Sequence, residues 1–242
     1  IINSDTDLKL ASKRIVWGKF FNSGQTCVAP DYLVAHKSIK GTLIKELINR
    51  IEKTLGKQLE KTDDFTAIVN EKNFNRLVGL INKNNLIYGG KYDKDKRYIS
   101  PTIIDSPKMD EEIMKEEIFG PILPVLSFEK IEDIDNIINK NPNPLALYVF
   151  SDNKKFNEII INRYPFGGGA INDTIVHLAN SRLPFGGIGS SGIGSYHGKA
   201  SFELFSHKKS VVKRSTWFDN NLRYAPYKNK LSLVRKIMKY LG

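Results

Sequence analysis

The stretch that decides the fold runs from residue 122 to residue 171 and reads ILPVLSFEKIEDIDNIINKNPNPLALYVFSDNKKFNEIIINRYPFGGGAI. Its apolar runs predict three short buried strands, at residues 122–128, 145–150 and 168–171. The segments between them predict two helices, at residues 132–139 and 153–163. Strands that are apolar throughout and alternate with helices are typical of a parallel sheet. The stretch therefore predicts an α/β fold with an open, mostly parallel sheet covered by helices on both faces.

The part of the chain before residue 122 continues this alternation. A helix over residues 8–20 is expected after a cap at Asp5 or Thr6, and NSG at 22–24 ends it. We expect one sheet to hold the strands near residues 32, 122, 146 and 168, with Cys27 close to one end, because open α/β sheets bind ligands at the carboxyl ends of their strands. The other expected elements are helices at 39–55 and 70–84 and strands at 32–36, 86–90 and 97–104.

The composition is that of an ordinary globular chain. Its 242 residues are 40% hydrophobic and 26% charged, which excludes a disordered or collagen-like protein. The net charge of +11 is concentrated in residues 207–242, which hold ten Lys or Arg against one acid, Asp219, and so account for +9. The rest of the chain is nearly neutral.

Cys27 is the single cysteine, which excludes an intramolecular disulfide and a multi-cysteine metal site, and we expect no bound metal. One thiol in a chain of this length fits a reducing compartment. No apolar run reaches the ~20 residues of a membrane-spanning helix, and the first residues lack the basic and apolar regions of a signal peptide. These features predict a cytoplasmic protein.

Cys27 lies in a loop between the helix end at residues 22–24 and the next strand. A lone cysteine is most often a small buried hydrophobe, and that is one interpretation. The other is a nucleophile. Gly24 permits close approach of the backbone, so peptide N–H groups can converge where attack on a carbonyl builds an oxyanion. The loop alone leaves both interpretations open.

Three motifs, in order along the chain, resemble those of one enzyme family. Residues 22–27, NSGQTC, are similar to the thiol signature of the NAD(P)-dependent aldehyde dehydrogenase superfamily. Residues 116–121, EEIFGP, resemble its second signature. Three further segments are similar to the class 3 branch, which includes fatty and aromatic aldehyde dehydrogenases. They are LPFGG at 183–187, SG at 191–192 and SYHGK at 195–199.

The resemblance, which extends from residue 1 to about residue 227, implies roles for four side chains. Cys27 resembles the nucleophile, whose thiolate adds to an aldehyde, and its backbone N–H resembles one oxyanion donor. Glu117 resembles the carboxylate that accepts hydrogen bonds from the nicotinamide ribose, and Phe119 the ring that positions the nicotinamide. Phe185 falls near the family's substrate channel. The implied cofactor is NAD or NADP, and the implied substrate is an aldehyde.

These residues also have structural interpretations. Glu117 fits a solvated charge at a helix end, and Phe119 fits a core aromatic beside a turn. The two glycines after Phe185 fit tight packing. Asn172 and His177 match family positions as well, but we interpret both as structural hydrogen bonders, with His177 a satisfied buried imidazole.

The chain is expected to divide into a catalytic domain, residues 1–205, and a C-terminal basic arm with an oligomerisation segment, residues 206–242. The family's dinucleotide-binding domain, its hydrolytic Glu and the Asn that completes its oxyanion hole match nothing in this sequence. We therefore interpret the sequence as the C-terminal half of an enzyme, inactive as an isolated fragment. Residues 210–214 have a charged flank that suits an edge strand, and we expect them to join the sheet of a second copy in a homodimer.

Three functions of different classes stay open. The first is the catalytic part of an aldehyde dehydrogenase, which the motifs around Cys27 and Glu117 favour. The second is a catalytically silent, interaction-only copy of that domain. The third is a membrane-surface or nucleic-acid module built on the basic tail, although its aromatic residues are too few and too irregular for us to expect a nucleic-acid partner. A helical stripe of apolar residues in the tail is compatible with peripheral membrane contact, but we favour a docked terminal helix with a solvated basic face or a disordered end. The stripe consists of Leu231, Val234, Ile237, Met238 and Leu241.

Overall fold

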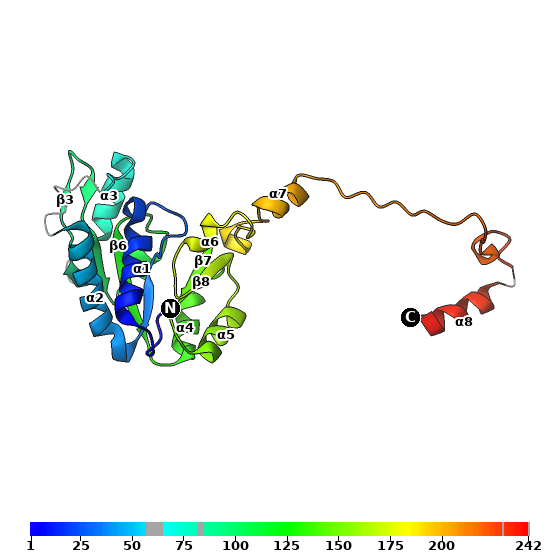
Figure 1. Ribbon diagram of the computed structural model, residues 1–242, viewed down its shortest axis with the longest axis horizontal. Helices are drawn as coiled ribbons and strands as arrows, with labels where there is room; N and C mark the ends of the chain where they lie inside the picture. The colour runs from blue at the N-terminus through cyan, green and yellow to red at the C-terminus, as the bar shows by residue number, and fades with distance from the viewer. Residues whose placement is uncertain (57–64, 82–84, 229, 242) are drawn as a thin grey trace. The chain divides into compact units, whose positions relative to one another are not determined.

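The computed structural model describes residues 1–56, 65–81, 85–228 and 230–241. The chain divides into two compact units, Ile1–Phe205 and Ser206–Gly242. The first unit holds the sheet and most of the helices (Figure 1). The expected helix at 70–84 is present as α3, Glu71–Leu80, and its predicted last residues, 82–84, lie outside the described part.

Four strands form the main sheet in the order β1-β6-β5-β2. β1, β6 and β5 are parallel, and only β2 runs antiparallel to its neighbour. Two further pairs are parallel β7-β8 and antiparallel β3-β4. The mostly parallel α/β sheet expected from the sequence is thus confirmed. The strands are β1 Leu33–His36, β2 Leu86–Tyr88, β3 Tyr92–Asp93, β4 Tyr98–Ile99, β5 Thr102–Asp105, β6 Ile122–Phe128, β7 Ala146–Val149 and β8 Gly168–Ile171.

The first three residues join the main sheet to the β7-β8 pair. Ile2 pairs in parallel with Ala35 on one side and with Phe150 on the other. The Ile2 N–H donates to the Val34 carbonyl, and the Asn3 N–H donates to the Phe150 carbonyl, both at 2.9 Å. The expectation of one continuous sheet is therefore corrected. β7 and β8 form a separate pair, and a segment with no recognisable strand pattern bridges the gap.

Helices cover both faces of the sheet. Successive side chains of a strand point to opposite faces, and here both sets are apolar, so each face needs a cover. Ala35 and Ile103 pack with α1 and α2 in one apolar cluster. Their neighbours Val34 and Ile104 pack with α3, α4 and α5 in the other. The helices are α1 Leu8–Phe20, α2 Lys37–Leu55, α3 Glu71–Leu80, α4 Ile131–Ile138, α5 Lys154–Arg163, α6 Val176–Ala179, α7 Gly198–Leu204 and α8 Leu231–Leu241.

The first helix spans the expected residues, 8–20, but its cap is not the one expected. Asp7 caps α1, and its carboxylate accepts two backbone N–H groups of the first turn. The two residues proposed as caps have other partners. Asp5 accepts a hydrogen bond from the Ser151 hydroxyl, and the Thr6 hydroxyl donates to the Phe150 carbonyl at 2.6 Å. Both contacts tie the start of α1 to the end of β7.

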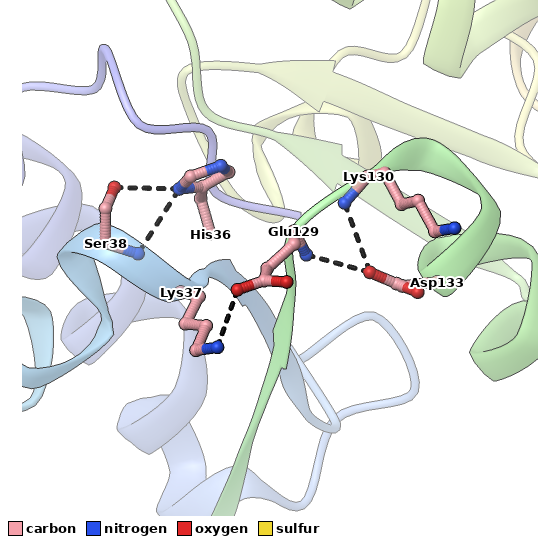
Figure 2. A network of polar contacts seen from close by, with 6 residues as sticks. All are labelled: His36, Lys37, Ser38, Glu129, Lys130 and Asp133. Atoms are coloured by element: carbon pink, nitrogen blue, oxygen red, sulfur yellow. Dashed lines mark hydrogen bonds and ion pairs between the residues drawn. The ribbon is translucent and has the colours of Figure 1, made fainter.

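Polar contacts fill the turns at the carboxyl ends of β1 and β6 (Figure 2). His36, the last residue of β1, caps α2 by accepting the Ser38 N–H through Nδ1. After β6, the Asp133 carboxylate accepts the Glu129 N–H at 2.9 Å and fixes the start of α4. An ion pair between Lys37 and Glu129, 2.6 Å long, joins the two turns. The polar side chains at this edge of the sheet therefore cap the helices that follow the two strands.

The second unit consists of an irregular stretch and α8. Residues 210–214 form no strand, so the expected edge strand is absent from the single chain. Val211 and Val212 are both exposed, and a strand without a hydrogen-bonded neighbour has nothing to fix its extended backbone. Among the described residues, no helix is long and apolar enough to span a membrane.

Candidate active site

Cys27 and Glu117 lie in two loops that lead into neighbouring strands. Residues 25–32 precede β1, and residues 115–121 precede β6. β1 and β6 pair in parallel, with Leu33 opposite Val125. Parallel neighbours begin at the same edge of a sheet, so the two loops meet at its amino edge. The expectation that placed the ligand site at the carboxyl ends is wrong, because both motifs come before their strands.

The loop before Cys27 has an unusual backbone. Asn22, Ser23 and Gly24 adopt left-handed conformations in succession, with φ of 52°, 54° and 73°. Non-glycine residues in this region cost roughly 1–3 kcal/mol each and persist only where the surroundings hold them. Here the Gln25 side chain does so, because its amide donates to the Ala67 carbonyl at 3.1 Å and its oxygen accepts the Val69 N–H at 2.9 Å.

Gly24 brings the thiol loop against the Glu117 loop. A Cβ atom at Gly24 would lie 2.3 Å from the carbonyl oxygen of Gly120. Gly120 itself packs on α3, where an added Cβ would lie 2.5 Å from Leu77 Cδ2. Only glycine fits between these backbones, so the spacing of the two loops depends on Gly24.

The Cys27 side chain is exposed, which excludes the buried-hydrophobe interpretation. It lines a cavity of about 830 Å³ at the amino edge, together with Asp31, Glu117 and Tyr148. In the part of the chain that the structure describes, the Cys27 N–H donates to no acceptor. The residue that brings the thiol to the cavity therefore also carries a backbone donor without a described partner, and attack on a carbonyl needs such a donor.

Tyr148 fixes the backbone directly after Cys27, and the sequence analysis did not identify this residue. Its hydroxyl donates to the Val28 carbonyl at 2.7 Å, and both side chains are buried. Burial raises the pKa of Tyr148 well above its ordinary value, so the phenol stays a donor. A tyrosine within an otherwise aliphatic buried strand was the available signal, because a buried hydroxyl needs a partner.

Glu117 is exposed, and its carboxylate accepts no hydrogen bond from the described residues. Partial shielding of the carboxyl from water raises its pKa; Asp31 adds to this rise, and Lys19 and Arg76 oppose it. The backbone of the loop is held firmly. The Arg76 guanidinium donates to the Ile118 carbonyl at 2.6 Å. A fixed loop thus presents an unpaired carboxylate in the same cavity as Cys27.

The other predicted residues lie apart from this cavity wall. Phe119 shares the Glu117 loop and has a left-handed φ of 47°, but it is absent from the cavity lining. Phe185 is buried against His177 and His197 rather than in the cavity. The roles of Phe119 at the nicotinamide and of Phe185 in the substrate channel stay predictions.

Asn172 is the structural hydrogen bonder expected, because its side-chain amide bonds both the N–H and the carbonyl of Ser151. His177 differs from its expectation. It is buried, yet neither ring nitrogen has a partner among the described residues. The rings of Tyr148 and Phe185 pack against it and leave it no polar group to bond. Burial accordingly lowers the pKa of His177.

Comparison with known proteins decides the family. The family model described as Aldehyde dehydrogenase family matches residues 1–211. The chain belongs to the aldehyde dehydrogenase family. A relative named 4,4'-diaponeurosporen-aldehyde dehydrogenase, from Staphylococcus aureus, is 45% identical over 241 residues, which cover 99% of this chain and 52% of the relative. The family membership and the class 3-like resemblance are thus confirmed.

Two further aldehyde dehydrogenases extend the comparison. The bovine relative, named aldehyde dehydrogenase, dimeric NADP-preferring, is 41% identical over 92% of this chain and 93% of its own length. The substrate-bound structure of Staphylococcus aureus AldH superposes with a TM-score of 0.90 at 44% identity, covering 98% of this chain and 52% of that one. The chain spans about half the length of both staphylococcal aldehyde dehydrogenases.

Among residues 1–56, 65–81, 85–228 and 230–241, no group of three or more His, Cys, Asp or Glu side chains is placed to hold a metal ion.

Proposed function

We propose that this chain supplies the thiol-bearing part of an aldehyde dehydrogenase that oxidises an aldehyde to a carboxylic acid with NAD or NADP. The single observation that carries the proposal is the exposed Cys27, which shares one cavity with the unpaired Glu117 carboxylate and has a free backbone N–H. Relatives named for aldehyde oxidation support the same conclusion.

Cys27 performs the covalent chemistry in this proposal. Its thiolate sulfur forms a bond to the aldehyde carbon, and the carbonyl π electrons move to the oxygen. The Cys27 N–H, which has no acceptor of its own, donates to that oxyanion. When the adduct carbon gives up its hydride, the carbonyl reforms as a thioester. Attack by water then forms a C–O bond and breaks the C–S bond, which releases the carboxylate product and the thiolate and gives the two protons of the water to the solvent.

The residues at the cavity also fit the nicotinamide end of a dinucleotide. NAD or NADP, when bound, supplies the acceptor for the hydride. Glu117 is suited to hold the ribose, because a carboxylate without hydrogen-bonded partners can accept two hydroxyl donors at once. Phe119 follows two residues later in the same loop, outside the cavity lining, and we assign its ring to the nicotinamide. These roles are part of the proposal.

A catalytically silent copy of the domain is the main alternative. Such a copy has no need to maintain Asn22 and Ser23 in costly conformations beside an exposed thiol. The strained loop and the free Cys27 N–H therefore favour the enzyme. A membrane-surface module built on α8 has only the basic, apolar helix itself to support it.

We also propose that the protein works as a homodimer in the cytoplasm. The bovine relative is named dimeric, and the extended, exposed residues 210–214 are free to pair with a second copy. Light scattering on the intact protein tests this assembly, and a monomeric mass would contradict it.

Turnover by the protein at its full encoded length tests the function. We expect aldehyde-dependent formation of NADH or NADPH, followed at the reduced-nicotinamide absorbance band. Cys27→Ser should abolish it, because an alcohol is a far weaker nucleophile. Glu117→Gln should slow hydride transfer in single turnovers while leaving thioester hydrolysis little changed. Unchanged turnover in Cys27→Ser would contradict the proposal.

A further inference from the structure

Lys19 is a fully buried lysine that the chemistry described above does not use. It lies near the end of α1, and its side chain is 1% exposed. Lysine is almost never fully buried without a charged partner. Burial lowers the pKa of Lys19 to about 8, and the nearby carboxylates of Asp31 and Glu117 oppose this shift. The buried Lys19 side chain is therefore within electrostatic range of Asp31 and Glu117, two acidic residues that line the cavity.

Asp31 connects the thiol loop to the Glu117 loop. Its Oδ1 accepts the Ile118 N–H at 3.1 Å. Burial raises the pKa of Asp31, while the charges of Lys19 and Arg76 oppose the rise. The Asp31 charge also acts on Tyr32, since burial and, to a lesser extent, Asp31 raise the pKa of that phenol to about 12. Without its cationic neighbours, Asp31 would therefore tend to take up a proton.

We propose that Lys19 is a positioning residue: its buried ammonium keeps Asp31 ionised, and Asp31 in turn anchors the Ile118 N–H and with it the loop that presents Glu117. The inference rests on the proposed function, because the value of a fixed Glu117 lies in holding the nicotinamide ribose. The anchor itself is a property of the chain and can be measured without substrate or cofactor.

The charge of Asp31 strengthens the hydrogen bond that it accepts from the Ile118 N–H. A hydrogen bond to an ionised acceptor is roughly twice as strong as a neutral one. The Ile118 peptides are also held from the other side, since the Arg76 guanidinium donates to the Ile118 carbonyl at 2.6 Å. Arg76, on α3, therefore contacts the loop directly, whereas Lys19, on α1 at the opposite face of the sheet, acts on it only through the charge of Asp31.

Lys19 has no other evident reason to be charged. Replacing a buried charge by a well-packed hydrophobic residue of similar volume is often neutral or stabilising. Selection for stability alone would favour methionine at this position, on a buried face of α1 that carries no other charged residue. The charge is explained if it acts on Asp31.

Amide hydrogen exchange at Ile118 tests the anchor. We expect Lys19→Met to accelerate exchange at Ile118 roughly fivefold to tenfold at neutral pH, the difference between a charge-assisted and a neutral hydrogen bond. Asp31→Asn, which keeps an acceptor oxygen but removes the charge, should have a similar effect. In the double variant Lys19→Met should add nothing further. Lys13→Met, at an exposed position of the same helix, is the matched control.

The internal standard is the exchange of β6 amides, which should stay constant if the fold is intact. Unchanged exchange at Ile118 in Lys19→Met, or additive effects in the double variant, would overturn the proposal. If Lys19→Met fails to fold, Asp31→Asn alone still decides, since unchanged exchange there removes the anchor. Loss of the proposed dehydrogenase function would leave these results unaffected, so the two failures are distinguishable.

Discussion

Gly24→Ala should separate the two loops of the site. The substitution adds one methyl group where φ is +73°, a conformation that costs an L-residue roughly 1–2 kcal/mol. The new Cβ would lie 2.3 Å from the Gly120 carbonyl oxygen, and real Cβ contacts essentially never fall below 3.0 Å. The backbones must therefore move apart by at least 0.7 Å, the difference of those two distances.

The energetic cost follows from these two effects. Overpacking of this kind costs typically about 1–3 kcal/mol, which together with the backbone conformation gives roughly 2–5 kcal/mol. That is a large share of the roughly 5–15 kcal/mol of stability of an ordinary domain. Gly41→Ala is the matched control, because Gly41 lies within α2 and an added Cβ there meets nothing within 4 Å. It should stabilise the chain by about 0.5–1 kcal/mol.

Urea unfolding followed by circular dichroism measures both variants, and iodoacetamide labelling of Cys27 reports on the loop in the folded state. We expect Gly24→Ala to lose stability and to change the labelling rate. Gly41→Ala should lose no stability and should leave the labelling rate of Cys27 unchanged. A Gly24→Ala variant within about 0.5 kcal/mol of the wild type, a surface-like effect, with an unchanged labelling rate would refute the argument.

Two further predictions concern buried polar groups. Tyr148→Phe removes the donor to the Val28 carbonyl and should cost about 1–3 kcal/mol in urea unfolding, because a buried acceptor is left unpaired; an unchanged midpoint would contradict this. Lys19 should make stability rise with pH. It loses its proton near pH 8 when folded but near 10.5 when unfolded, so the unfolded chain binds more protons between these values. The free energy of unfolding should increase by about 2 kcal/mol from pH 8 to 9.5 in the wild type and stay flat in Lys19→Met. Equal slopes in the two proteins would show that Lys19 is not buried as a cation.

Periodicity was sufficient for the long elements of this fold. The apolar spacing of residues 39–55 corresponds to α2, Lys37–Leu55, and the apolar run at 32–36 corresponds to β1. Short strands are different, because their neighbours define them. Residues 1–3 contain too few side chains for any pattern, yet they pair on both sides. Residues 210–214 have the pattern but pair with no strand among the residues that the structure describes.

The site was predictable where chemistry and chain order coincide. Cys27 and Glu117 were identified from their motifs, and the parallel pairing of β1 with β6 explains why they meet. Lys19 was missed because a lysine is expected on the surface, although its spacing of four residues from Ile15 and eight from Ala11 places it on the buried face of α1. His177 was expected to have a partner, which depends on the packing of Tyr148 and Phe185 and not on its own sequence context.

Acylation of Cys27 by an activated ester tests the central claim most directly. If the loop presents the thiol and its oxyanion donor, the folded chain should react with p-nitrophenyl acetate faster than the urea-unfolded chain, and mass spectrometry should place one acetyl group on Cys27. Cys27→Ser should remain unmodified. A folded chain that reacts no faster than the unfolded one would contradict the account, because its loop would then confer no reactivity beyond that of an ordinary exposed cysteine.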